Sequence, residues 1–391
     1  MQKVSPIAIG KQPMRRKIKK QDNILPCYDT YIKRWQQFEK TIMLKTKNIF
    51  LDAEIFVGSG YFHNAKLIEL AKHGGNEDVT LYLTEITVNE IRSNIKEDIN
   101  TVIHQVNEFK KKVHRNGRIL KKIEGFKEYI ELPKIDSKTD FNKINQSLND
   151  FIEKGKVKLI PYQGIELKNI LDKYFNREKP FGDGKKKYEF PDAIVIESIE
   201  KWCFDNNEKI YVISGDSDLS DYTSDNIYPL NKVSTILNLI NREINVNQAK
   251  LEWIDKIYND NLGLIELKIA KRFTEKFIDE ISFELDVSDV QVESLRFFDY
   301  SIIRQDEGDI ILQMDVDIDF SCSISYTKRT WEDFERKHAN IDKATTITVE
   351  LEFEAYFEDK EHNQDISIHC IYTSIPSEED VEDWIDGLDY D

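Results

Sequence analysis

The sequence lacks several features that each define a class of protein. No stretch reaches about 18 consecutive apolar residues, so we expect no transmembrane helix. The first twenty or so residues contain no apolar run of the secretory kind, so we expect no secretory signal. Cys27, Cys203, Cys322 and Cys370 are scattered without Cys-x-x-Cys spacing, which argues against a zinc site or a disulfide framework. Together these absences predict a cytoplasmic protein with no membrane partner.

Motifs of nucleophilic catalysis are missing as well. The chain contains no Gly-x-Ser-x-Gly motif and no Cys–His arrangement of the hydrolase kind. Its histidines, among them His63, His73 and His104, show no spacing suited to a metal site. Any catalysis must therefore rest on other groups.

Charge is distributed unevenly along the chain. The formal net charge of −17 arises from a net of +7 over residues 1–250 and −24 over residues 251–391. Such a split predicts two domains with different partners, because the first part tolerates a polyanion and the second repels one. The acidic part has three open interpretations: it binds a basic protein partner, it covers the basic insertion described below and inhibits the first domain, or it keeps the chain soluble.

Hydrophobic patterns divide the chain into three parts. Residues 1–47 form a basic arm followed by a helix, residues 48–247 an α/β domain, and residues 248–391 an acidic β-rich domain. The α/β domain contains a long helical insertion at about 104–156, whose basic segment 110–122 is either a solvated face or a nucleic-acid contact. Short apolar runs predict its strands, at 48–52, 79–83, 157–162, 209–214 and 226–230. Because helical patterns alternate with these strands, we expect a mostly parallel sheet covered on both faces.

Beyond about residue 250 the apolar spacing changes to every second residue. In the segment 311–326, apolar residues alternate with Asp and Ser, and in 345–356 with Thr and Glu. This pattern is typical of antiparallel strands with one buried face and one polar face. We therefore predict either a β-sandwich or a sheet with one or two helices, in which the segment 281–287 forms an early strand.

Five acidic residues stand where a parallel sheet gathers functional groups. Asp52 ends the first predicted strand, and Glu90 lies in the first turns of the helix after the second. Asp192 opens a later helix, and Asp216 and Asp218 directly follow the strand 209–214. Functional groups collect at the carboxyl ends of strands and at adjacent helix starts in open parallel sheets. We therefore predict that these five residues form an active site.

A cluster of carboxylates selects a particular chemistry. Neighbouring carboxylates cannot all stay ionised at neutral pH unless a cation joins them, and hard oxygen ligands select Mg²⁺ or Mn²⁺. Such ions polarise a phosphodiester and activate a water molecule, so that no nucleophilic side chain is needed. Each acid alone also has a structural explanation, as a helix-start residue or a turn former. The ordered set favours metal-dependent hydrolysis.

These segments resemble the motifs of the PIN-domain nucleases. NIFLDAEIF resembles the first strand of that family with its Asp, and TEITVNEI resembles the helix that carries its Glu. PDAIVIESI resembles the third acidic motif, and YVISGDSDL resembles the last one. The resemblance spans about residues 48–235 and is closest to larger bacterial PIN-like proteins with an insertion and a C-terminal extension. It implies a PIN-like parallel sheet flanked by helices. It also implies a nuclease, in the first place an endonuclease that acts as a ribonuclease, with RNA or single-stranded DNA as the substrate. By resemblance, Asp52, Glu90, Asp192 and Asp216 bind the metal and Asp218 assists.

Two places depart from the family pattern or add to it. The first motif reads Asp-Ala-Glu, so that Glu54 stands where many relatives have Asn; it either alters the site or points elsewhere. The loop 180–190 carries Lys185, Lys186 and Lys187, which we hypothesise contact the substrate backbone, the alternative being a solvated loop. Unchanged affinity and salt dependence after their replacement by alanine would remove this hypothesis.

Two rival functions remain open at this point. A haloacid-dehalogenase-like phosphatase also has an Asp after its first strand, but it needs Asp-x-Asp where this chain has Asp52 and Glu54, and it leaves Glu90 without a role. A non-catalytic PIN-like binding or scaffold module would use the β-rich domain to hold a partner. Metal-dependent cleavage by the folded protein separates the nuclease from the scaffold.

Overall fold

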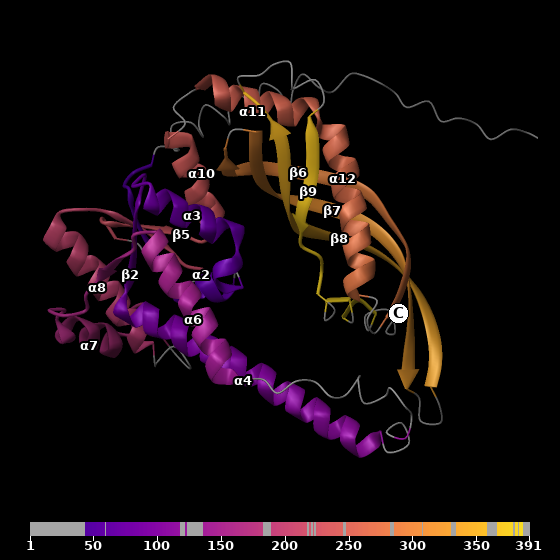
Figure 1. The fold of residues 1–391 in the computed structure, drawn as a ribbon, viewed down its shortest axis with the longest axis horizontal. Helices are drawn as coiled ribbons and strands as arrows, with labels where there is room; N and C mark the ends of the chain where they lie inside the picture. Colours follow the sequence, from indigo (N-terminus) through magenta and orange to yellow (C-terminus); the bar gives the residue numbers. More distant parts are fainter. Residues whose placement is uncertain are drawn as a thin grey trace, which may run out of the picture. The chain divides into compact units, whose positions relative to one another are not determined.

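A computed structural model describes most of the chain after residue 43 (Figure 1). The described residues are 44–58, 60–117, 122, 136–182, 189–216, 219, 222, 224–244, 248–281, 285–306, 308–329, 334–357, 366–377, 380–381 and 383–385. The predicted basic arm and nearly all of the helix expected before residue 47 lie outside them. No helix among these residues has the length and apolarity needed to cross a membrane.

The first sheet has five parallel strands in the order β3-β2-β1-β4-β5. They are β1 (Asn48–Leu51), β2 (Thr80–Thr84), β3 (Lys158–Ile160), β4 (Ile210–Ile213) and β5 (Ile227–Leu230). Each forms where an apolar run predicted it, which confirms the expected parallel sheet. The central strand β1 pairs with β2 and β4, and these pairings bring the ends of three strands to the same edge.

Helices cover both faces of this sheet, which explains why its strands are apolar on both sides. They are α2 (Ala53–Gly58), the 3-10 helix η1 (Tyr61–His63), α3 (Ala65–Gly75), α4 (Glu85–Asn116), α6 (Ser137–Lys154), α7 (Leu167–Asn176), α8 (Phe190–Asn206) and α10 (Val233–Ile244). Ile49 and Leu51 pack on the face covered by α3 and α10, whereas Phe50 packs on the face covered by α8. The predicted helical insertion contains the end of α4 and all of α6.

The second sheet is antiparallel, with the order β6-β7-β8-β9. It consists of β6 (Asp286–Gln305), β7 (Gly308–Arg329), β8 (Phe334–Ala355) and β9 (Ser367–Thr373), and it follows α11 (Gln248–Asp260) and α12 (Leu262–Ile281). Val316, Ile318 and Phe320 are buried on the face that packs against Phe273 and Phe277 of α12. The predicted alternation is confirmed, as is the form with two helices. The expected start of the β pattern near residue 250 is wrong, because α11 and α12 occupy 248–281.

The two sheets share a hydrophobic core. Ile303 of β6 and Ile311 of β7 are buried in the same cluster as Ile49 and Leu51 of the parallel sheet. As a result, residues 44–391 form one compact unit. The division into domains at residue 247 stays a prediction about the architecture.

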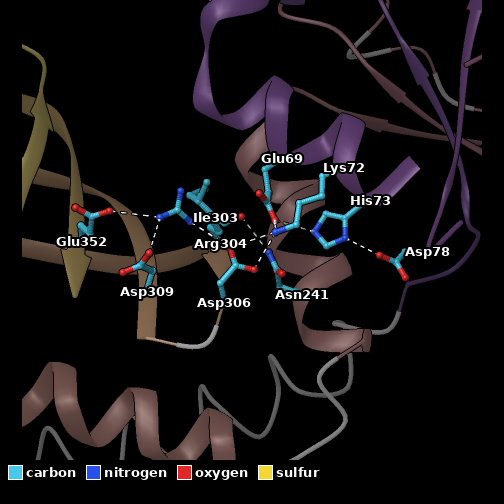
Figure 2. Close-up of polar contacts among 10 residues, drawn as sticks. All are labelled: Glu69, Lys72, His73, Asp78, Asn241, Ile303, Arg304, Asp306, Asp309 and Glu352. Carbon is cyan, nitrogen blue, oxygen red and sulfur yellow. Dashed lines mark hydrogen bonds and ion pairs between the residues drawn. The ribbon is translucent and has the colours of Figure 1, made fainter. Parts of the chain in front are cut away.

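Polar contacts reinforce this shared core (Figure 2). The buried side chain of Asn241 on α10 donates hydrogen bonds to the carbonyl oxygens of Ile302 and Ile303, both at 3.1 Å. Asn238, one turn earlier, accepts a bond of 3.1 Å from the backbone N–H of Ile302. Lys72 of α3 pairs with Asp306 at 2.8 Å. The edge strand β6 thus has backbone groups capped by side chains of α10 instead of by a further strand.

Candidate active site

The predicted acids occupy the carboxyl edge of the parallel sheet. Asp52 directly follows β1, and its backbone N–H donates to the carbonyl of Ile213 in β4 at 3.0 Å. Glu90 lies in the second turn of α4, the helix that begins where β2 ends. Asp192 lies in the first turn of α8, and Asp216 follows β4. Two strand ends and the first turns of two helices therefore supply the four acids.

Ser214 links the acid after β1 to the acid after β4. Its hydroxyl is fully buried and donates to Oδ2 of Asp52 at 2.7 Å, while its oxygen accepts from the backbone N–H of Asp216 at 3.0 Å. Oδ1 of Asp52 accepts from the N–H of Ala53 at 2.7 Å. Burial raises the pKa of Asp52, the bonds from Ser214 and Ala53 oppose that rise, and the charge of Asp216 adds to it. Ser214 is thus a positioning residue that orients Asp52 and favours its charged form.

If Asp52 binds a metal as the sequence predicts, replacing Ser214 by alanine is expected to lower the rate of the predicted nucleic-acid cleavage about 10–100-fold, the usual cost of losing a group that orients a metal ligand. Without the hydroxyl, Asp52 loses a donor that favours its charged form. The matched control is Ser198→Ala, since the hydroxyl of Ser198 is equally buried but bonds a carbonyl of its own helix at 2.6 Å. Rates of metal-dependent cleavage measure the effect, and equal rates for the two variants would contradict it.

Glu90 and Asp192 both have a raised pKa, to which neighbouring carboxylates contribute. Burial, together with the charges of Asp52 and Glu189, raises the pKa of Glu90 to about 7. Burial also raises the pKa of Asp192 to about 8, with further contributions from a hydrogen bond to Glu189 and from the charges of Asp52 and Glu90. A hydrogen bond between two carboxyl groups requires a proton on one of them. In the absence of a cation, the site therefore holds protons at neutral pH.

Glu54 belongs to the site as well. A Cβ atom built on Gly215 would lie 3.2 Å from Oε2 of Glu54, so this carboxylate lies directly against the backbone between Ser214 and Asp216. Burial raises the pKa of Glu54, and the charges of Asp216 and Asp52 add to the rise. Of the two outcomes considered for this departure from the family pattern, the structure favours the one in which Glu54 alters the site.

Sequence reasoning missed two residues of this site. Glu189 immediately precedes α8, three positions before Asp192, and an acid at a helix start was the signal available for it. Ser214 ends the strand 209–214, but its two hydrogen bonds depend on the pairing of β1 with β4. Asp218 and the three lysines Lys185, Lys186 and Lys187 lie outside the described residues.

The residues fit a divalent cation in chemistry but are not assembled around one. Asp52, Glu90, Asp192 and Asp216 offer carboxylate oxygens, the ligands that Mg²⁺ and Mn²⁺ select. Burial raises the pKa values of Asp52, Glu90 and Asp192, and neighbouring carboxylates add to each rise, as expected for buried acids without a counter-ion. Within the described part of the chain, no three acidic, imidazole or thiol side chains are yet close enough to form a metal-binding group.

The parallel sheet has the strand order β3-β2-β1-β4-β5 and carries acidic residues at its carboxyl edge. These features define an α/β protein with a carboxylate-rich candidate active site. Residues 49–219 match the family model of the PIN domain, so this part of the chain is a PIN domain. The resemblance noted in the sequence motifs is thereby confirmed. PIN domains are generally nucleases that use divalent metal ions, so this chain has a nuclease fold. No curated protein and no solved structure gives a match to the chain.

Proposed function

We propose that the protein is a metal-dependent nuclease that hydrolyses phosphodiester bonds of RNA or single-stranded DNA as an endonuclease. The pattern of raised pKa values at the edge of a PIN-domain sheet carries this proposal, since burial raises the pKa of Asp52, Glu90 and Asp192 and the charge of Asp52 adds to the rise at the other two. It is what a carboxylate site awaiting a cation would display. Because the PIN-domain match covers both acidic motifs that the phosphatase alternative relied on, we favour the nuclease.

In this proposal Asp52, Glu90, Asp192 and Asp216 hold Mg²⁺ or Mn²⁺, with Asp218 as a further ligand. The bound ion would polarise the phosphodiester and lower the pKa of the attacking water. The chain's own residues would orient a carboxylate and hold a proton. Ser214 fixes the carboxylate of Asp52, and the pair of Glu189 and Asp192 holds a proton that it releases when positive charge enters the site.

Lys185, Lys186 and Lys187 would contact the phosphate backbone of the substrate, since they precede α8, the helix that carries Asp192. A basic protein that binds the acidic β-rich domain is a second partner in this proposal. Its support is the net charge of −24 over residues 251–391. Its test is a pull-down of the full chain at low and at high salt, with loss of capture at high salt as the expected result.

A cleavage assay tests the proposed function. The full chain would be incubated with end-labelled single-stranded RNA, single-stranded DNA and duplexes, each with Mg²⁺, Mn²⁺ or EDTA. We expect internal cleavage of a single-stranded substrate that requires the metal and that disappears in a folded Asp216→Asn variant. Asp205→Asn, an exposed acid of α8, is the matched control and should cleave normally. Absence of cleavage from every substrate would favour the scaffold instead.

A further inference from the structure

A cavity of about 730 Å³ lies between the two sheets, beside the acidic site. One wall comes from α2, the start of α3 and the start of α10, and the other from β7, β8 and β9. Its volume falls within the range of about 300–1,000 Å³ that is typical of small-molecule sites. The β-rich domain therefore contributes one of the two walls of this open cavity.

The cavity borders the acidic site. Glu54 and Gly215 line it, and both also belong to the group of residues around Asp52 and Asp216. A strand whose phosphodiester lies at those acids would reach the cavity with a neighbouring nucleotide. Because the cavity lies next to the acids, the relevant occupant is a part of the bound strand.

The charges on the walls exclude a phosphate group as that occupant. The cavity has two lysines, and each is already paired with a carboxylate of the second sheet: Lys66 with Glu350 at 2.9 Å, and Lys232 with Asp315 at 3.0 Å. A phosphate would have to displace one of these partners. Glu350 is buried, so losing Lys66 would leave an unpaired carboxylate in a poorly solvated place.

The remaining lining suits a heterocyclic base. Tyr372 and Ile371 of β9 offer an aromatic and an aliphatic surface, and the amide of Asn231 offers donors and an acceptor. Gln313 is 7% exposed, and within the described part of the chain its Oε1 has no hydrogen-bond partner. Single-stranded nucleic acids are recognised by bases that stack on aromatic side chains and bond along their edges.

We propose that this cavity binds a nucleobase of the single-stranded substrate, from a nucleotide next to the cleaved bond. The proposal rests on the proposed function, because the acids place the strand. It assigns the β-rich domain a role in choosing where the nuclease cuts.

The test measures binding, so that it does not depend on catalysis. The full chain would be titrated into fluorescently labelled single-stranded oligonucleotides in Ca²⁺, and the same samples would be run on a gel to detect cleavage. One abasic nucleotide would be placed at successive positions. We expect one position at which loss of the base weakens binding about tenfold.

Ala65→Phe fills the cavity from the first residue of α3, and Ile68→Phe adds a ring on the solvent-exposed side of the same helix. We expect Ala65→Phe to bind the intact strand about tenfold more weakly and to lose its response to the abasic position. Ile68→Phe should bind the intact strand and respond to the abasic position as the parent chain does. Tyr372→Ala, at an exposed position of β9, should reproduce the effect of Ala65→Phe without filling the cavity.

The outcomes separate the two proposals. A protein that shows this binding pattern but cleaves no substrate keeps the base site and refutes the nuclease. A protein that cleaves with equal affinity for every abasic strand, or that binds no strand at all, refutes the base site.

Discussion

Replacing Asp192 by asparagine is expected to raise the thermal stability of the metal-free protein while it lowers the rate of cleavage about 10²–10³-fold. The two effects have one cause. The pKa of Asp192 is raised to about 8 by burial and by its acidic neighbours, so its charged form is unfavourable in the folded state unless a cation is bound. Asparagine removes that unfavourable charge and, with it, a proposed metal ligand.

The stability effect depends on pH in a definite direction. The folded metal-free protein binds more protons than the unfolded chain between the ordinary carboxyl pKa of about 4 and the raised values of about 7 for Glu90 and about 8 for Asp192. Its free energy of unfolding therefore falls as pH rises through this interval. We expect the free energy of unfolding of Asp192→Asn to equal that of the parent chain near pH 4. Above pH 8 it should exceed the parent value by the largest amount.

Thermal denaturation in EDTA from pH 5 to pH 9 measures this difference. At pH 8 we expect a melting temperature about 2–4 °C higher for Asp192→Asn, a modest value because solvent screens this partly exposed group. Mn²⁺ should stabilise the parent chain more than the variant. Asp205→Asn, at the exposed end of the same helix, should follow the parent chain throughout. A variant less stable than the parent at pH 8 would contradict the argument.

Asn241→Ala is expected to lower the free energy of unfolding by about 2–3 kcal/mol. Asn241 is 3% exposed, and its amide holds the carbonyl oxygens of Ile302 and Ile303 at the junction of the two sheets. Alanine would leave two buried acceptors on an edge strand with fewer donors. It would also leave space beside the shared core.

Urea denaturation followed by tryptophan fluorescence measures this cost. Asn259→Ala is the matched control, because the exposed amide of Asn259 donates to a carbonyl of its own helix at 2.7 Å. We expect the control to change stability by no more than about 0.5 kcal/mol. If the two variants unfold at the same urea concentration, the junction contributes little to stability.

The parallel sheet and four of its acids were predictable because each depends on local pattern. Short apolar runs ending in Asp52 and near Asp216 mark buried strands, and acids at the starts of helices mark Glu90 and Asp192. Ser214 was not predictable, because its role requires Asp52, which is 162 positions away in sequence, to lie 2.7 Å from its hydroxyl. Glu189 was missed because its importance comes from the helix that holds it beside Asp192.

The β-rich domain was predicted in part. The predicted two-residue alternation of its strands is correct. However, the prediction started this β pattern near residue 250 and so included α12, which is a helix. There, Ile265, Ile269, Phe273 and Phe277 recur at every fourth position and are all buried, so a helical signal was present. The shared core and the cavity depend on how two sheets meet, and no spacing within one segment contains that information.

The position of Ile303 and Ile311 in the core of the parallel sheet has a consequence for synthesis on the ribosome. The last acidic motif ends near Asp216, yet the hydrophobic core beneath it stays incomplete until about residue 311 has emerged. At about 5–20 residues per second, translation leaves the nascent N-terminal part with uncovered apolar surface for roughly 5–20 s. Chaperones that bind exposed apolar chain have that interval in which to act, and slowing translation between codons 216 and 311 would lengthen it.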